Sequence, residues 1–208
     1  MKNKTVAGAL AFSATAALAL APSAYAHHPM GGATPSNLFE GLASGLGHPV
    51  IGLDHLLFIL AVGVACYYFG RRAGTVAAFI AGTLAGTVVH LYKATLPYPD
   101  VWVALSLVAL GILFFRGHGF LRSKAALGIF ALSGIAHGYA YGEAIVGAEP
   151  TPLAAYLVGF TLVQLAIVCA GYAIARYAER REPGPRAAAA VGGALSVAGV
   201  AFLALSLV

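Results

Sequence analysis

Two imidazoles and a carboxylate occur within eight residues, at the start of an apolar stretch that runs to Gly70. The segment reads His48-Pro49-Val50-Ile51-Gly52-Leu53-Asp54-His55. Imidazole and carboxylate groups are typical ligands of first-row divalent metals. A charged side chain inside a bilayer is costly, about 2.5–3.5 kcal/mol for Asp on an insertion scale. Such groups usually contact an ion, a proton path or one another, so the segment is a candidate metal site.

The chain around this segment has the composition of an integral membrane protein. It is 60% hydrophobic and 9% charged, with a mean hydropathy of +0.86, whereas soluble domains have about 25% charged residues. In such a chain the formal charge of +5 reports topology rather than nucleic-acid binding. We therefore expect an all-α, polytopic membrane protein that contacts the lipid bilayer and no nucleic acid. The two cysteines, Cys66 and Cys169, fall in apolar segments and imply no disulfide framework.

The first 26 residues have the pattern of a secretory signal peptide. Lys2 and Lys4 precede an apolar run over 6–21, and Ala24-Tyr25-Ala26 fits the small-x-small cleavage rule. Cleavage would leave His27 as the new N-terminus, outside the cytoplasm. The prediction is a signal peptide over 1–26, an extracytoplasmic tail over 27–46 and a transmembrane domain over 47–208. An uncleaved first membrane helix is the alternative.

Six further segments are long enough to cross a bilayer, since a crossing takes about 20 residues. They cover 47–70, 74–92, 100–115, 125–147, 152–175 and 187–208. Basic residues follow the first, third and fifth segments: Arg71, Arg72, Arg116, Arg122, Lys124, Arg176, Arg180, Arg181 and Arg186. The other side has only Lys93, which gives nine against one. The positive-inside rule then predicts a bacterial inner-membrane protein with the mature N-terminus and the C-terminus on the periplasmic side.

More ionisable residues fall at the depth of the first motif. His90 lies near the outer end of the second span, and the outer part of the fourth contains His137 and Glu143. The predicted metal ligands are thus His48, Asp54, His55, His90, His137 and Glu143. The inner half has no comparable acid or imidazole. One buried histidine is usually a satisfied core residue, but six such groups at one depth favour a functional site.

Helix geometry limits how these groups can meet. His48 and His55 share a face of an ideal helix but lie about 10 Å apart along its axis, and Asp54 projects about 120° away from His48. One ion could hardly contact all three on a straight helix. Pro49 suits a first helical turn, so we expect His48 at the cap, folding back over the site from the outer loop. Asp54 and Glu143 could instead orient the imidazoles.

These residues resemble the signature of the HupE/UreJ family. The match comprises His48-Pro49-x-x-Gly52-x-Asp54-His55 and the following Leu56-Leu57-Phe58-Ile59-Leu60-Ala61-Val62-Gly63. The resemblance covers nearly the whole chain, and it implies a small permease for nickel, sometimes cobalt, associated with nickel-enzyme operons. It marks His48, Asp54 and His55 as the positions most important for transport. The family's fourth-span pattern is similar to His-Gly-x-Ala-His-Gly-x-Glu, but here Tyr141 occupies the second histidine position, and a phenol is a poor ligand.

The leading hypothesis is secondary uptake of Ni²⁺ or Co²⁺, with the ion as substrate, no resident cofactor and no enzymatic activity. The sequence has no P-loop motif, so the chain itself shows no ATPase. An intramembrane zinc-dependent hydrolase is the main alternative, because several His and Asp side chains could hold zinc and activate water. A haem-binding electron carrier with axial histidines is a third hypothesis. His27 and His28 are weak candidates for metal capture outside the membrane.

Overall fold

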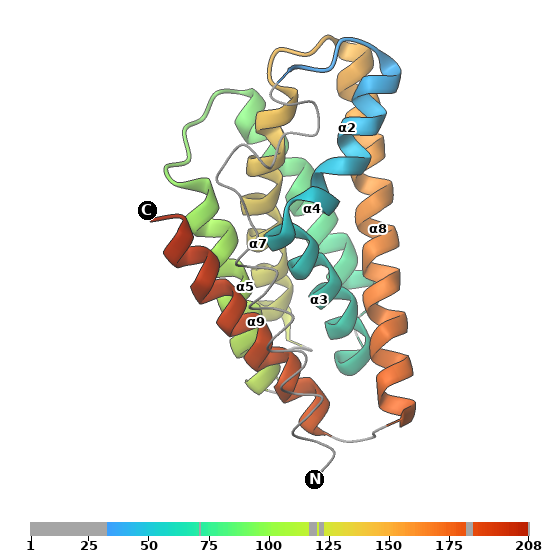
Figure 1. Cartoon of the computed structure of the whole chain (residues 1–208), viewed down its shortest axis with the longest axis vertical. Helices are drawn as coiled ribbons and strands as arrows, with labels where there is room; N and C mark the ends of the chain where they lie inside the picture. The colour runs from blue at the N-terminus through green and yellow to red at the C-terminus, as the bar shows by residue number, and fades with distance from the viewer. Residues whose placement is uncertain (1–32, 71, 117–119, 121–122, 182–184, 208) are drawn as a thin grey trace.

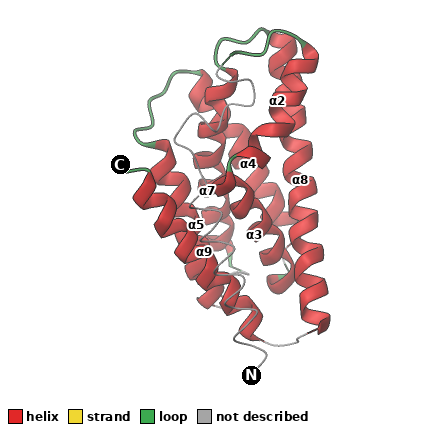
Figure 2. Cartoon of the chain, in the orientation of Figure 1, coloured by secondary structure: helices red, strands yellow, loops and turns green. Residues whose placement is uncertain are grey.

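The computed structural model describes residues 33–70, 72–116, 120, 123–181 and 185–207. Within these residues the secondary structure is entirely helical, and Figure 2 shows helices joined by short loops, with no strand in this part of the chain. The all-α fold class is therefore confirmed. The predicted signal peptide over 1–26 lies outside the described residues.

The helices follow the predicted spans closely. They are α2 (Leu38–Ile51), α3 (Leu53–Phe69), α4 (Arg72–Leu91), α5 (Pro99–Arg116), α7 (Lys124–Gly142), the short 3₁₀ helix η2 (Glu143–Ile145), α8 (Pro150–Arg181) and α9 (Pro185–Leu205). In Figure 1 the connections after α4 and after η2 lie at the same end of the bundle as the start of α2. The connections between helices therefore alternate between the two ends of the bundle, as the predicted apolar segments require.

Fewer helices than predicted meet the length and composition of a membrane span. Among the described residues, α4, α5, α8 and α9 do so, and the bent pair of α2 and α3 counts as a fifth. The remaining candidate, α7, contains the polar residues Ser133, His137, Tyr139 and Tyr141, all of them buried. Because those side chains face protein rather than lipid, α7 is less apolar than a lipid-exposed span. The described residues thus support a membrane protein with four or five candidate spans, and the sixth crossing stays a prediction.

The largest departure from expectation is the break in the first predicted span. The segment 47–70 is two helices that meet at Gly52 with a bend of 80°. Pro49 lies inside α2 rather than in a first turn, and His48 lies in the last turn of α2 rather than at a cap. Helix α2 also begins at Leu38, within the range predicted as a tail, where the Asn37 side chain accepts a hydrogen bond from the Glu40 N–H.

Helices α2 and α3 pack one after the other along α8, as Figure 1 shows. Close approach depends on glycine. A Cβ at Gly45 would meet the backbone of Tyr156 and Phe160, and a Cβ at Gly63 would meet Val168 and Tyr172. Small residues let helix backbones approach in a membrane. The two half-helices thus cover one long face of α8 between them.

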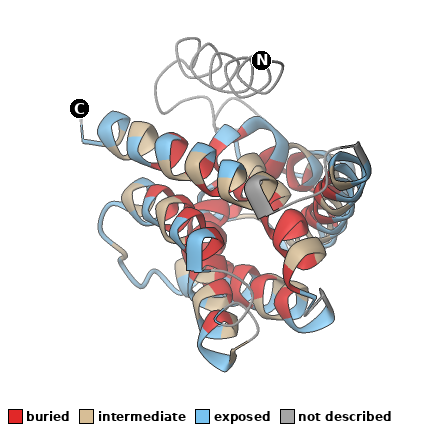
Figure 3. Ribbon diagram, turned by 90° about the horizontal axis from the view of Figure 1, so that it is seen from below, coloured by how far each residue is buried: buried red, intermediate tan, exposed pale blue. Residues whose placement is uncertain are grey.

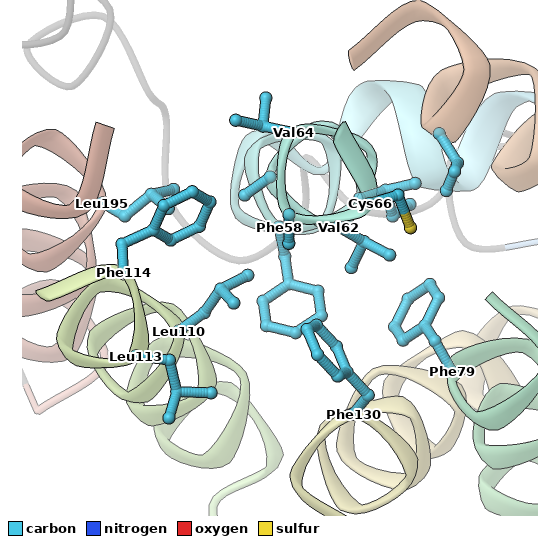
Figure 4. Close-up of a cluster of buried hydrophobic side chains, with 14 of the residues drawn as sticks. Phe58, Val62, Val64, Cys66, Phe79, Leu110, Leu113, Phe114, Phe130 and Leu195 are labelled. Carbon is cyan, nitrogen blue, oxygen red and sulfur yellow. The ribbon is translucent and has the colours of Figure 1, made fainter. Parts of the chain in front are cut away.

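Two further helix pairs complete the bundle. Helix α4 packs against α7, and α5 packs against α9. The first pair is joined by Thr87, whose hydroxyl donates to the Gly138 carbonyl at 2.8 Å. Figure 3 shows the buried residues turned toward the space between the helices. In Figure 4, Phe58 of α3 points toward Phe130 of α7, with Phe79 of α4 beside them.

Replacing Gly138 with alanine is expected to destabilise the contact between α4 and α7. A Cβ there would overlap the backbone of Thr83. Overpacking of this kind costs about 1–3 kcal/mol, so the melting temperature of the purified protein should fall. Gly128→Ala is the matched control, because a Cβ at Gly128 meets nothing within 4 Å. Equal melting temperatures for the two variants would contradict this packing.

Candidate metal centre

Three of the six predicted ligands form a row of imidazoles inside the bundle. The ring centroids of His48 and His55 are 5.8 Å apart, and those of His55 and His137 are 4.8 Å apart. Each residue is at most 2% exposed. The three rings come from α2, α3 and α7, so the row joins the consecutive helices α2 and α3 to α7, which is distant from them in the sequence.

The break at Gly52 allows His48 and His55 to meet. On a continuous helix their seven-residue separation would place them about 10 Å apart along the axis. The 80° bend shortens that separation. His48 therefore reaches His55 through a bend between two helices, whereas the sequence predicts it at a cap in the outer loop.

The two helix ends that meet at the break carry opposite partial charges, and each affects the side chains beside it. The last carbonyls of a helix lack partners within the helix, and its C-terminus favours cations. His48 lies in this last turn of α2. The N-terminus of α3 favours anions, and the buried Asp54 lies in its first turn, where Oδ1 accepts a hydrogen bond from the His55 N–H at 2.8 Å. The Asp54 carboxylate thus offsets the positive helix end.

A chain of hydrogen bonds sets the tautomers of His137 and His55. The Ser106 hydroxyl donates to the Val103 carbonyl at 2.6 Å, so its oxygen accepts from His137 Nε2–H at 2.9 Å. A neutral imidazole has one N–H and one acceptor nitrogen. His137 Nδ1 is then the acceptor for His55 Nδ1–H, at 2.7 Å. This arrangement leaves the lone pair of His55 on Nε2.

A second set of hydrogen bonds orients His48 in the same way. The Tyr156 hydroxyl donates to the Tyr141 carbonyl at 2.7 Å, so its oxygen accepts from His48 Nδ1–H at 3.1 Å. The lone pair of His48 is again on Nε2. Metal-ligating histidines usually donate their other N–H to a fixed acceptor, which sets the tautomer and the ring orientation. His48 and His55 have this arrangement.

Tyr141 packs against both of these histidines. Its ring centroid lies 5.1 Å from that of His48 and 4.6 Å from that of His55. The residue is fully buried, and its hydroxyl has no hydrogen-bond partner among the described residues. Tyr141 shares a helix face with His137, as their four-residue spacing predicts. It therefore adds an oxygen atom to the imidazole row.

Aromatic rings close the row beyond His137. Its ring centroid lies 4.5 Å from that of Phe58 and 6.0 Å from that of Phe79. These two phenylalanines begin the apolar cluster that Figure 4 shows between α3, α4, α5 and α7. The surroundings of His137 are thus mainly aromatic, with the Ser106 hydroxyl as its polar neighbour.

The other predicted ligands lie away from the row. His90 stacks on Tyr139, with centroids 4.3 Å apart, and Tyr139 is on the face of α7 opposite His137. Glu143 caps the C-terminus of α7 through its backbone N–H and is exposed. The structure thus brings together His48, His55 and His137 with Asp54 adjacent, and it does not bring His90 or Glu143 to them.

No group of three or more His, Cys, Asp or Glu side chains that could hold a metal ion occurs among the described residues. A catalytic zinc needs three protein ligands held together. The intramembrane zinc hydrolase therefore gains no support from this part of the chain. A transported ion has a weaker requirement, because it must also leave.

Sequence reasoning missed two residues that orient the site. Ser106 is the one serine in the apolar helix α5. A lone polar residue in a predicted span could have indicated a buried hydrogen bond from the sequence alone. Tyr156 of α8 had no such signal, because its role depends on the path of α2. Both act on the histidines through hydrogen bonds.

Comparison with known proteins agrees with the motifs. The family model described as HupE / UreJ protein matches residues 15–202. The chain belongs to this family. The match includes every helix of the site. Among curated HupE/UreJ-type proteins, Protein HupE of Rhizobium leguminosarum bv. viciae is 30% identical over 194 residues, which is 90% of this chain and 94% of that protein. No solved structure matches the chain.

Removing the Tyr156 hydroxyl is expected to weaken metal binding while the fold persists. Tyr156→Phe keeps the buried ring but removes the acceptor for His48 Nδ1–H. Loss of such an orienting partner typically lowers metal affinity by about 10–100-fold. Equilibrium binding of Ni²⁺ to the purified protein measures the effect. Tyr92→Phe is the control, since Tyr92 is 83% exposed; unchanged affinity in Tyr156→Phe would contradict the role of the hydroxyl.

Proposed function

We propose that this protein takes up a divalent transition-metal ion, Ni²⁺ or alternatively Co²⁺, by secondary transport through the imidazole row. The observation that supports this most strongly is the meeting of His48, His55 and His137 from three helices at a break in a membrane span. Discontinuous helices of this kind form ion sites in many transporters, with helix ends and unwound backbone near the ion. Family membership supports the same function.

The donor set suits a cargo that binds and leaves. Imidazole is a good ligand for nickel, and a nearby carboxylate offsets part of the positive charge. His48 and His55 present Nε2 lone pairs, and Asp54 supplies the buried carboxylate. We propose that the ion exchanges waters for these ligands a few at a time. Transient coordination requires no closed cage of three protein ligands.

The driving force would be the membrane potential. Moving one charge is worth about 2.3 kcal/mol per 100 mV, and a dication gains about twice that. An inside-negative potential therefore favours uptake. Glu143, exposed at the end of α7, would raise the local cation concentration, and His90 stays a predicted secondary ligand outside the row.

The proposal includes the membrane arrangement that the sequence predicts. Six crossings follow if α7 spans the bilayer within the bundle, shielded from lipid by α4 and α5. The signal peptide is then removed, and both mature termini lie on the periplasmic side of the inner membrane. The imidazole row would lie on the path from that side.

His55→Ala should abolish radioactive nickel uptake by cells, because His55 links His48 to His137 within the row. Loss to background is expected at matched levels of protein in the membrane. His118→Ala is the control, since the sequence places His118 in a basic loop. Equal, background-level uptake by the wild type and by His55→Ala would refute nickel transport, and parallel cobalt and zinc assays define the specificity.

Comparing His137→Ala with His90→Ala tests whether uptake depends on the imidazole row or equally on all six predicted ligands. Removing His137 takes away the acceptor of His55 Nδ1–H, so uptake should fall about tenfold or more. His90 packs on Tyr139 outside the row, so its removal should reduce uptake by less than about threefold. Uptake measured over a range of nickel concentrations tests this order, and a larger loss for His90→Ala would contradict it.

A further inference from the structure

Gln164 of α8 is a buried polar residue that the proposed site has not used. It is 0% exposed. Its amide N–H donates to the Phe160 carbonyl at 3.1 Å, which holds the amide group against its own helix. Its carbonyl oxygen, Oε1, has no hydrogen-bond partner among the described residues. An unpaired buried carbonyl is costly, and such a group needs a physical reason.

The position of Gln164 on α8 supplies that reason. Residues at spacings of four lie on one face of a helix. On this face, Tyr156 and Phe160 contact Gly45 of α2, whereas Val168 and Tyr172 contact Gly63 of α3. Gln164 lies between these two contacts. It therefore occupies the level of α8 at which α2 ends and α3 begins, which Figure 1 shows about halfway along α8.

The same face of α8 already serves the imidazole row. The Tyr156 hydroxyl accepts from His48, and the Phe160 ring packs on Tyr141 with centroids 5.6 Å apart. Gln164 follows Phe160 by one helical turn, about 6 Å further along the helix axis. Gln164 therefore lies next to Phe160 on the part of α8 that contacts α2 and α3.

We propose that the Gln164 carbonyl oxygen binds the divalent cation, directly or through a water of its hydration shell, at the break between α2 and α3. This proposal rests on the proposed function. A neutral amide oxygen is a ligand for hydrated divalent cations that adds no charge. With the imidazoles of His48 and His55 it would form a mixed nitrogen and oxygen site.

Gln164→Leu separates a ligand from a packing residue. Leucine removes the unpaired carbonyl and has a similar size, so the melting temperature without metal should be unchanged or higher. The affinity for Ni²⁺, measured with the full-length protein in nanodiscs, should nevertheless fall about tenfold, and the stabilisation by Ni²⁺ should shrink with it. Thr161→Val is the matched control, since the Thr161 hydroxyl bonds only to Leu157 of its own helix; it should bind within about twofold of wild type.

Gln164→Glu is the second variant and keeps the shape of the side chain. A carboxylate at this position should tighten Ni²⁺ binding about tenfold and slow its release, so that uptake falls while binding increases. If Gln164→Leu binds Ni²⁺ like the wild type, or if its metal-free stability and its affinity fall together, the proposal is wrong. If Gln164→Leu does not fold, unchanged affinity in Gln164→Glu overturns it. Failure of the wild type to bind Ni²⁺ would instead refute the proposed function.

Discussion

A helix that breaks inside an apolar environment exposes backbone groups that water cannot satisfy, and the site of this protein is built around such a break. At Gly52, the C-terminus of α2 and the N-terminus of α3 meet at 80°. The Gly52 N–H still bonds to the His48 carbonyl at 3.2 Å, and Asp54 accepts a backbone N–H of α3. The remaining carbonyls at the end of α2 favour a cation. The break costs backbone hydrogen bonds, and in the proposed transport a cation at this point would offset that loss.

The break persists because α8 supports both half-helices. Gly45 and Gly63 allow α2 and α3 to pack directly on the α8 backbone, one above the other. The long, uninterrupted α8 thus acts as the fixed element against which the bend is held. It also supplies Tyr156, which orients His48. One helix therefore determines both the position of the break and the chemistry beside it.

The hydrogen bonds of the row fix the tautomers and the ring orientations of its histidines. Ser106 and Tyr156 each use their single hydroxyl hydrogen on a backbone carbonyl, so each oxygen is an acceptor for an imidazole. In both cases the imidazole donates through Nδ1, which places its lone pair on Nε2, at His55 and at His48. Phe58 and Phe79 pack against His137, so aromatic rings and the Ser106 hydroxyl together fix its ring.

Local pattern alone determined much of this description. Hydropathy predicted an all-helical membrane protein and the approximate bounds of α4, α5, α8 and α9, because burial in lipid requires long apolar runs. Residue type and depth selected six candidate ligands, His48, Asp54, His55, His90, His137 and Glu143, and the motifs among them indicated the family to which the chain belongs. These inferences depend on properties that each segment has by itself.

Only the tertiary structure decided which groups meet. His90 and Glu143 have the same residue types and similar depths as the others, yet helix rotation and the end of α7 place them elsewhere. The bend at Gly52 was not predicted, because hydropathy joins 47–70 into one span-length segment. Ser106, Tyr156 and Gln164 became relevant only through contacts between helices. Depth along the membrane is a local property of a sequence. Rotation about each helix axis, which selects the contacts, is set by the packing of all the helices together.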